Sequence, residues 1–306
     1  MWKHSRRRKR NRGESQPFPL VNPDAAGIDL GSRSHFVSVP EDRDPRPVRQ
    51  FGCYTAELHR MAEWLKQCGI KTVAMEATGV YWVPVFEILE GHGFEVLLVD
   101  ARQVKNLSGR KSDVVDCQWV RHLHSYGLLR AAFRPKAEVC QLRAYWRQRT
   151  SLVESASRRI LLMQKALEQM NVQLHKAVSD ITGQTGISII RAIVRGEHDP
   201  RALSELRDAR LKSSREELVQ ALTGHYREEH LFALAQALES YDFFHRQIES
   251  CDRKLQSCME RLPGQAPREV TQKPRPTRRK NQPYFDLRAE QVRIAGIDLT
   301  RVPACP

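Results

Sequence analysis

The chain has 306 residues, of which 41% are hydrophobic and 28% are charged, so it can bury a sizeable core in one or two domains and is not wholly disordered. No stretch approaches the roughly 20 apolar residues of a membrane-spanning helix, and no apolar segment follows the basic start, as it would in a secretory signal. The net charge of +14 favours a polyanionic partner without separating DNA from RNA or an anionic membrane, and we expect a cytoplasmic protein.

A basic arm over residues 1–24 precedes a region, 25–135, that mixes strands with helices. The apolar patterns predict strands over residues 26–31, 34–39, 48–54, 71–76 and 94–99. Thr55 is the expected N-cap of a helix that ends at Gly69, and a second helix is expected over residues 83–89. Strands that alternate with helices predict an α/β domain with a partly parallel sheet.

Two acidic residues occupy strand positions in this region. Asp29 interrupts an apolar strand, where a charge is unfavourable unless it is paired or bound to a metal ion. Glu76 ends a second buried strand. If these two strands are parallel neighbours, both side chains emerge at the carboxyl edge of the sheet, where α/β proteins bind their ligands.

A pair of aspartates follows on a predicted helix. Asp113 and Asp116 are three residues apart at the start of a helix that continues through Leu123, so their carboxylates share one face. Taken alone, Asp113 has a second interpretation, because an acid at a helix N-terminus is stabilised by the helix dipole. Asp100 also follows a strand and is a weaker candidate.

Four converging carboxylates predict a metal site. They would repel one another strongly, and a divalent cation removes that repulsion. Oxygen ligands without histidine or cysteine indicate Mg²⁺ or Mn²⁺, and two such ions support phosphodiester chemistry. A basic stretch directly precedes the aspartate pair and suits a phosphate backbone; its predicted nucleic-acid-binding residues are Arg102, Lys105, Arg110 and Lys111.

Residues 136–262 carry almost no strand signal. One set of apolar residues steps by three and four: Val153, Ala156, Ile160, Met163, Leu167, Met170 and Leu174. A second set keeps the period but is interrupted by His245 and Asp252: Leu231, Leu234, Leu238, Tyr241, Ile248, Leu255 and Leu262. The spacing predicts a long α-helical coiled-coil region and leaves open two antiparallel arms, a dimerising pair or an ordinary helical bundle.

Prolines and basic residues define a linker over residues 263–283. Residues 284–306 open a new segment, which we expect to be the start of a C-terminal domain that is cut short. The seven cysteines form no Cys-x-x-Cys pair, and we expect reduced thiols rather than a zinc site.

Three motifs resemble a known family. They are residues 22–29 (NPDAAGID), 73–82 (VAMEATGVYW) and 109–119 (GRKSDVVDCQW). Over about residues 22–298 the chain resembles the DEDD transposases of bacterial insertion sequences, the IS110 family. The family's four acidic positions coincide with Asp29, Glu76, Asp113 and Asp116.

The resemblance implies an RNase H-like, RuvC-type catalytic domain that cuts and transfers DNA strands with Mg²⁺ or Mn²⁺ held by the four acids. It also implies element ends and target DNA as substrates, a guide RNA, and a homo-oligomer assembled through the helical region. The family's C-terminal domain supplies a serine that joins DNA covalently. Ser188 does not match that motif, so we assign no catalytic serine and expect no autonomous transposition.

Two alternatives remain open. The first is a non-catalytic DNA- or RNA-binding remnant with the same fold. The second is an actin-like or sugar-kinase-type ATPase, because residues 27–32 resemble a phosphate loop and Gly-Ile-Asp-Leu recurs at residues 296–299. The aspartate pair behind a basic loop is not explained by a kinase.

Overall fold

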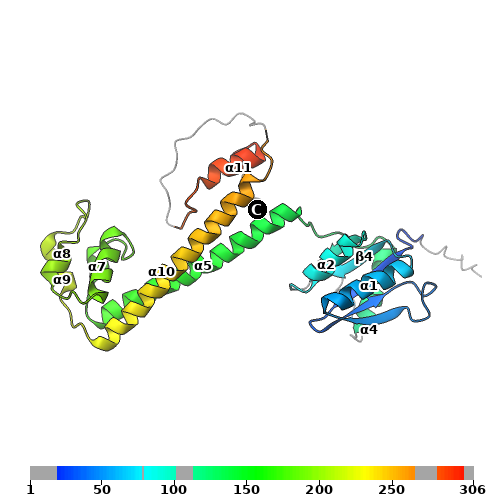
Figure 1. Ribbon diagram of the computed structural model, residues 1–306, viewed down its shortest axis with the longest axis horizontal. Coiled ribbons are helices and arrows are strands. Elements are labelled where there is room, and N and C mark those ends of the chain that lie inside the picture. The colour runs from blue at the N-terminus through cyan, green and yellow to red at the C-terminus, as the bar shows by residue number, and fades with distance from the viewer. Residues whose placement is uncertain (1–18, 78, 101–112, 266–280, 300–306) are drawn as a thin grey trace, which may run out of the picture. The chain divides into compact units, whose positions relative to one another are not determined.

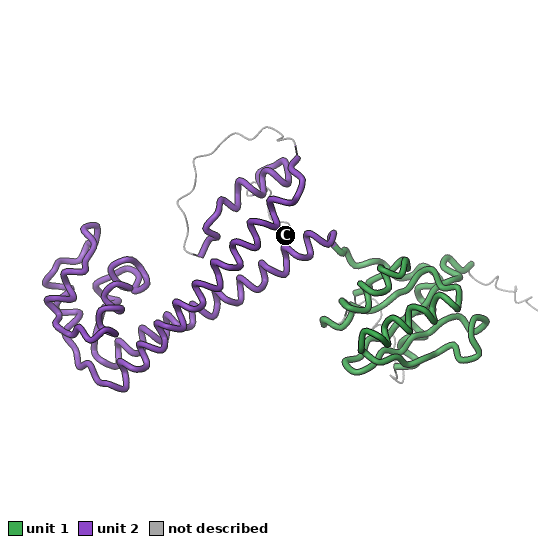
Figure 2. Tube along the Cα trace, in the orientation of Figure 1, with its two compact units in different colours: residues 1–134 green, residues 135–306 purple. Residues whose placement is uncertain are grey.

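The computed structural model describes residues 19–77, 79–100, 113–265 and 281–299. The chain divides into two compact units, residues 1–134 and 135–306, which are coloured separately in Figure 2. Each unit has its own core and is described by itself. The finer division into an arm, a catalytic domain, a helical region, a linker and a C-terminal segment stays a prediction.

The first unit is built on a five-stranded sheet with the order β3-β2-β1-β4-β5. The strands are β1 (Ala25–Leu30), β2 (Ser34–Ser38), β3 (Val48–Gly52), β4 (Thr72–Glu76) and β5 (Glu95–Val99). β2 pairs antiparallel with β1 and β3, whereas β4 pairs parallel with β1 and β5. This mixed sheet confirms the predicted α/β domain and is compatible with an RNase H-like fold.

Helices cover both faces of the sheet because alternate strand residues point to opposite sides (Figure 1). They are α1 (Thr55–Gln67), α2 (Trp82–Gly91) and α4 (Asp113–Ser125). Ile28 and Met75 point to the face that α1 and α2 cover, where they share a core with Leu58. Ala74 points to the other face and packs with Val120 of α4. The sheet is therefore the middle layer of this unit.

The predicted cap of α1 is wrong by one residue. Tyr54 is the N-cap and Thr55 is the first helical residue. The backbone is already extended at Tyr54, and its carbonyl accepts the first helical hydrogen bond, from Leu58 N, at 3.0 Å. No side chain forms a capping hydrogen bond at this end of α1. The sequence therefore has none of the usual N-cap residues at position 54, and the start of the helix could not be located from it.

Two long helices of the second unit, α5 (Ala137–Gln169) and α10 (Glu228–Glu260), lie side by side and antiparallel (Figure 1). Met163 and Leu167 of α5 are buried against α10, which contributes buried Leu234 and Leu238. Of the arrangements that the sequence left open, the structure shows an antiparallel pair within one chain. We call this pair the hairpin; coiled-coil packing of its seam stays a prediction.

Asp252, which breaks the apolar period of α10, is buried in the hairpin. Its Oδ1 accepts a hydrogen bond from Nε of Arg149 in α5 at 2.5 Å, and both side chains are almost fully covered. Its Oδ2 accepts a longer bond, 3.3 Å, from the backbone N of Tyr284. The interruption is thus a charge paired across the hairpin.

Four short helices connect the long ones: α6 (Leu174–Ala177), α7 (Gln184–Val194), α8 (Pro200–Ser204) and α9 (Arg215–Leu222). They pack on the hairpin through buried apolar residues that include Ile189, Ile190 and Leu218. A capping box between Ser214 and Glu217 starts α9.

The segment after the predicted linker contains α11 (Leu287–Ala295). Arg293 donates hydrogen bonds to the carbonyls of Met259 and Leu262, which attaches α11 beside the end of α10. The second Gly-Ile-Asp-Leu begins at Gly296, in a left-handed turn, and forms no strand in residues 296–299. It therefore gives no support to a duplicated nucleotide-binding fold. Within the described ranges, none of the helices has the length and apolar character to cross a membrane.

Candidate metal centre

Asp29 and Glu76 lie at the carboxyl ends of two neighbouring parallel strands. The register of β1 and β4 pairs Ala25 with Thr72 and continues to Ile28 and Met75. Asp29 and Glu76 are the next residue on each strand. Both are half-buried, and both follow residues that point to the α1–α2 core, so their side chains belong to the face that α4 covers.

Helix α4 crosses β1 closely because Gly27 has no side chain. A Cβ atom on Gly27 would lie 2.3 Å from the backbone N of Arg121 and 2.4 Å from the carbonyl O of Cys117. Gly27 and Asp29 are two residues apart on one strand and therefore share a face. The helix passes over β1 directly beside Asp29.

The far end of α4 is attached at the opposite edge of the sheet. Thr72, the first residue of β4, places Oγ1 2.9 Å from Nε2 of the buried His124. Asn22 donates its side-chain N–H to the carbonyl O of His124 at 2.8 Å. Because α4 ends where β4 begins, its first turn, with Asp113 and Asp116, lies at the edge where β1 and β4 end.

The electrostatics of Asp29 show that the acids gather there. Its pKa is raised to about 6, first by burial and then by the negative charges of Asp113, Asp116 and Glu76, in that order. A like charge raises a pKa appreciably only at short range. The structure therefore brings the four predicted acids together from two strands and one helix.

Cys117 is a neighbour of Asp29 that the sequence did not single out. It follows Asp116, is fully buried, and donates its thiol hydrogen to the carbonyl of Val114 at 3.1 Å. Burial, and then the charge of Asp29, raise the pKa of this thiol to about 12. Cys117 is therefore a protonated packing residue and not a thiolate ligand. Its position one turn after Asp113 was the available signal.

The donor set fits a hard divalent cation. All four groups are carboxylates, and their mutual repulsion is the term that a divalent ion would relieve. In the part of the chain that the structure describes, no group of three histidine, cysteine or acidic side chains is placed to hold a metal ion. The acids are near one another without forming a closed coordination shell, so metal binding requires side-chain movement.

The predicted nucleic-acid-binding residues Arg102, Lys105, Arg110 and Lys111 lie outside the described residues. Asp100, the weaker candidate, is exposed just after β5. Sequence reasoning also missed Gly27 and the contact between Thr72 and His124. The glycine two residues before Asp29 was a readable signal, because it leaves room on the face that carries the carboxylate.

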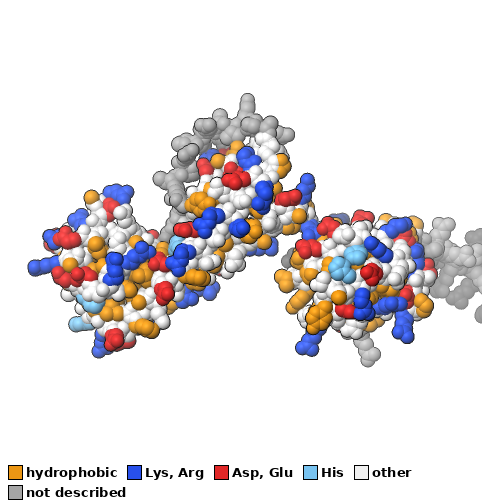
Figure 3. Space-filling model, viewed as in Figure 1, with side chains coloured by type: hydrophobic (Ala, Val, Ile, Leu, Met, Phe, Trp, Pro, Cys, Tyr) orange, Lys and Arg blue, Asp and Glu red, His pale blue; other side chains and the backbone are white. Residues whose placement is uncertain are grey.

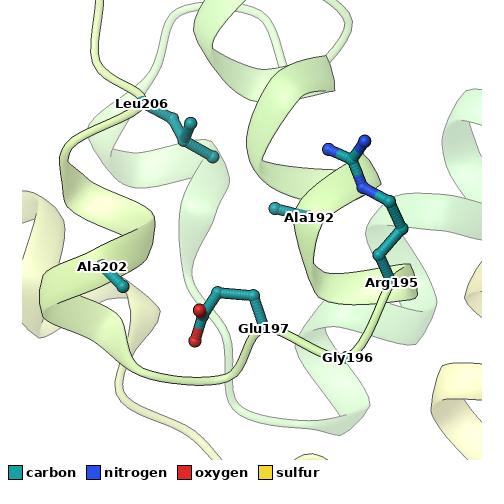
Figure 4. Close-up of a pocket in the computed structure, with 6 residues that line it drawn as sticks. All are labelled: Ala192, Arg195, Gly196, Glu197, Ala202 and Leu206. Carbon is teal, nitrogen blue, oxygen red and sulfur yellow. The ribbon is translucent and has the colours of Figure 1, made fainter.

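A pocket in the second unit contains none of the predicted site residues. It has a volume of about 460 Å³ and lies between α7 and α8, with Ala192, Arg195, Glu197 and Leu206 among its lining residues. Figure 4 shows Leu206 and Ala192 facing each other across it. Its two charged residues have opposite signs, so it does not resemble the acidic cluster.

Comparison with known proteins finds a family match. The model of the DEDD transposase family of the IS110 type, described as transposase, matches residues 26–172. The matched segment contains the sheet except for the first residue of β1, together with α4 and the four acids, and it continues through α5. A search of curated proteins found no match. Over residues 26–172 the chain is therefore similar to the DEDD transposases of the IS110 family.

Proposed function

We propose that this chain cleaves and transfers DNA strands with Mg²⁺ or Mn²⁺ bound by Asp29, Glu76, Asp113 and Asp116, on an RNase H-like, RuvC-type domain. The observation that carries the proposal is that β1, β4 and the first turn of α4, which hold the four acids, meet at one edge of the sheet. The charges of the other three acids raise the pKa of Asp29, which supports this placement. A half-buried carboxylate surrounded by like charges destabilises the fold unless a cation joins it. The site is therefore suited to a ligand of positive charge.

Each acid has a structural reason for its position. The adjacent ends of β1 and β4 hold Asp29 and Glu76 on rigid strands, and Gly27 lets α4 bring the aspartate pair beside them. Divalent ions bound by such a cluster would activate a nucleophile and stabilise the leaving oxygen of a phosphodiester. The protein's part is to hold the carboxylates and the DNA strand in register.

The proposed substrates are the element ends and the target DNA, with a guide RNA as the partner that selects them. The family match and the net charge of +14 support a nucleic-acid partner. The basic residues before α4, among them Arg110 and Lys111, remain the proposed contacts to the phosphate backbone. The guide RNA rests on the family resemblance alone.

The test compares strand cleavage by the full chain and its variants on labelled element-end DNA with the guide RNA and Mg²⁺. Asp29→Asn and Asp113→Asn keep the side-chain size and remove a ligand charge, and each should reduce the rate by at least about a hundredfold. Asp100→Asn is the matched control, because this acid also follows a strand and should leave the rate unchanged. Binding of the same DNA should persist in all three variants.

Equal cleavage by the wild type and both ligand variants would contradict the catalytic proposal. DNA binding without cleavage by any of the proteins, the wild type included, would favour the alternative of a nucleic-acid-binding remnant.

We also propose that two copies of the chain associate through the hairpin. Several large apolar side chains on α5 and α10 are exposed, among them Leu161, Leu162, Phe232 and Phe243. Leu162 lines a groove of about 530 Å³ between the two helices, whose other lining residues include Lys165 and Gln236. In Figure 3, hydrophobic and basic side chains alternate on the viewed face of these helices. A second hairpin would cover such a face.

Light scattering tests the association. The wild type should have a mass above that of one chain, and Leu162→Glu with Phe232→Ser should lower it to one chain while the helix content stays constant. Phe133, which is exposed in the first unit, provides the control variant Phe133→Ser. A monomeric wild type, or an oligomer that the double variant leaves intact, would exclude this surface.

A further inference from the structure

Two histidines of the first unit meet on the side of the sheet away from the acids. Nδ1 of His59, in α1, lies 2.9 Å from Nε2 of His92, which caps α2. The ring centroids are 5.2 Å apart and the planes are tilted by 49°. His59 is exposed and His92 is half-buried. Figure 3 shows histidine side chains gathered at the surface of this unit, where α1 and α2 run in Figure 1.

We propose that His59 and His92 form a second metal site, one that takes a borderline transition-metal ion such as Zn²⁺. Imidazole nitrogens bind Zn²⁺ at about 2.0–2.1 Å, so two of them on one tetrahedral ion lie roughly 3.3 Å apart. The observed separation of the two nitrogens is within about half an ångström of that value. Both rings must rotate so that the lone pairs of these two nitrogens, which face each other in the hydrogen bond, converge on one ion.

A metal ion can replace the hydrogen bond between the two rings without any change in the number of bound protons. In the neutral pair, one inner nitrogen carries the hydrogen and the other accepts it. If the donor ring changes tautomer, its proton moves to the outer nitrogen, and both inner nitrogens present lone pairs. The ion then takes the place of the shared hydrogen, and no net proton is released.

The backbone on both sides of the pair is fixed. His59 is adjacent to the fully buried Leu58, and its helix is anchored in the core by Met61 and Ala62. The backbone N–H of His92 donates to the carbonyls of Ile88 and Leu89 at the end of α2. The two ligands are therefore held near each other before any ion binds, which lowers the entropy lost on binding.

The chemistry of this site differs from that of the acids. Imidazole favours Cu²⁺, Ni²⁺ and Zn²⁺, whereas carboxylates favour Mg²⁺ and Mn²⁺. Across the described ranges no third histidine, cysteine or acid joins the pair, so water would complete the coordination. Affinity should follow the order Cu²⁺ above Ni²⁺ and Zn²⁺, with Mn²⁺ far weaker.

The test titrates the full chain with Zn²⁺ and with Cu²⁺ in excess Mg²⁺, which occupies carboxylate sites. Calorimetry should detect one Zn²⁺ site that weakens at least about tenfold in both His59→Ala and His92→Ala. Paramagnetic resonance of the Cu²⁺ form should show coupling to two imidazole nitrogens. His122→Ala removes an exposed histidine of the same unit and should change neither readout.

Asp29→Asn should keep the Zn²⁺ site, so that failure of this proposal and failure of the acidic centre are separate outcomes. Thermal unfolding without metal shows whether the histidine variants fold; if one does not, His92→Gln replaces it. Equal Zn²⁺ affinity in the wild type and the folded variants, or a Cu²⁺ signal from a single nitrogen, would overturn the proposal and leave a hydrogen-bonded pair.

Discussion

Asp29 in the first unit lies among three other acids, whereas Asp252 in the second unit is paired with Arg149 at 2.5 Å. Both aspartates are on regular elements and both are covered from solvent to a large extent. The charge of Asp252 is neutralised by Arg149, and this ion pair joins α10 to α5. The negative charge of Asp29 is opposed by the other acids, and a bound cation would relieve that repulsion. Buried charge thus stabilises the fold in the second unit, and in the first unit it forms the proposed metal site.

The largest expected loss of stability comes from breaking the ion pair between Arg149 and Asp252. Arg149→Met leaves Asp252 buried without its main partner, and the free energy of unfolding should fall by about 3–5 kcal/mol. Urea unfolding followed by circular dichroism measures the change. Arg191→Met is the control, because Arg191 pairs with Asp242 at an exposed site and should lose no more than about 1 kcal/mol.

A rescue sharpens this prediction. Adding Asp252→Leu to Arg149→Met replaces the ion pair with apolar side chains and should recover most of the lost stability. If Arg149→Met alone unfolds no more easily than Arg191→Met, the buried pair does not stabilise the hairpin.

The next largest loss of stability is expected from a substitution that pushes α4 away from the sheet. In Gly27→Ala the new methyl group meets the backbone of Cys117 and Arg121, which cannot move as a side chain can, so stability should fall by about 3 kcal/mol. The DNA cleavage rate should fall as well, because the first turn of α4 moves away from Asp29. Gly91→Ala is the control, since nothing lies within 4 Å of its Cβ. Unchanged unfolding of Gly27→Ala would show that α4 does not cross there.

The smallest effect concerns the clustered charge itself. Because the pKa of Asp29 is raised from 3.8 to about 6, the folded state holds a proton that the unfolded state has released. Stability therefore decreases as pH rises through this window, and the decrease is complete above about pH 6. Asp29→Asn removes it, so the variant should gain on the wild type from about pH 4 to 6 and keep a constant advantage above, on the order of 1 kcal/mol after allowance for solvent screening.

Urea unfolding of both proteins across this pH range measures the advantage. Burial lowers the pKa values of His35 and His124, so their contribution destabilises the folded protein as pH falls. Because this contribution is the same in the wild type and in Asp29→Asn, it cancels in the difference between them. Excess Mg²⁺ should abolish the advantage of Asp29→Asn. A constant difference at every pH would mean that Asp29 is not perturbed.

Much of the first unit was predictable because its signals are local. A charge inside an apolar strand marked Asp29, and the strand boundary marked Glu76. The approach of α4 was not predicted, although Gly27 permits it, because the packing partner is about ninety residues away in the chain.

In the hairpin, too, contacts between residues far apart in the chain could not be predicted from the sequence. Apolar periodicity predicted both long helices, but it cannot say whether a seam pairs within a chain or between chains. The break at Asp252 was visible, and its partner was not, since Arg149 lies 103 residues earlier. Of the predicted site, the gathering of the acids is seen in the structure, while their metal and their reaction remain proposals.

The most direct test of the account is the binding of Mn²⁺ to the full chain, measured by paramagnetic resonance at a pH above 6. Mn²⁺ should bind the wild type, and Asp100→Asn and His59→Ala should leave its affinity unchanged. Four substitutions should each weaken the binding: Asp29→Asn, Glu76→Gln, Asp113→Asn and Asp116→Asn. Binding that survives all four acid substitutions would contradict the claim that these carboxylates share a divalent ion.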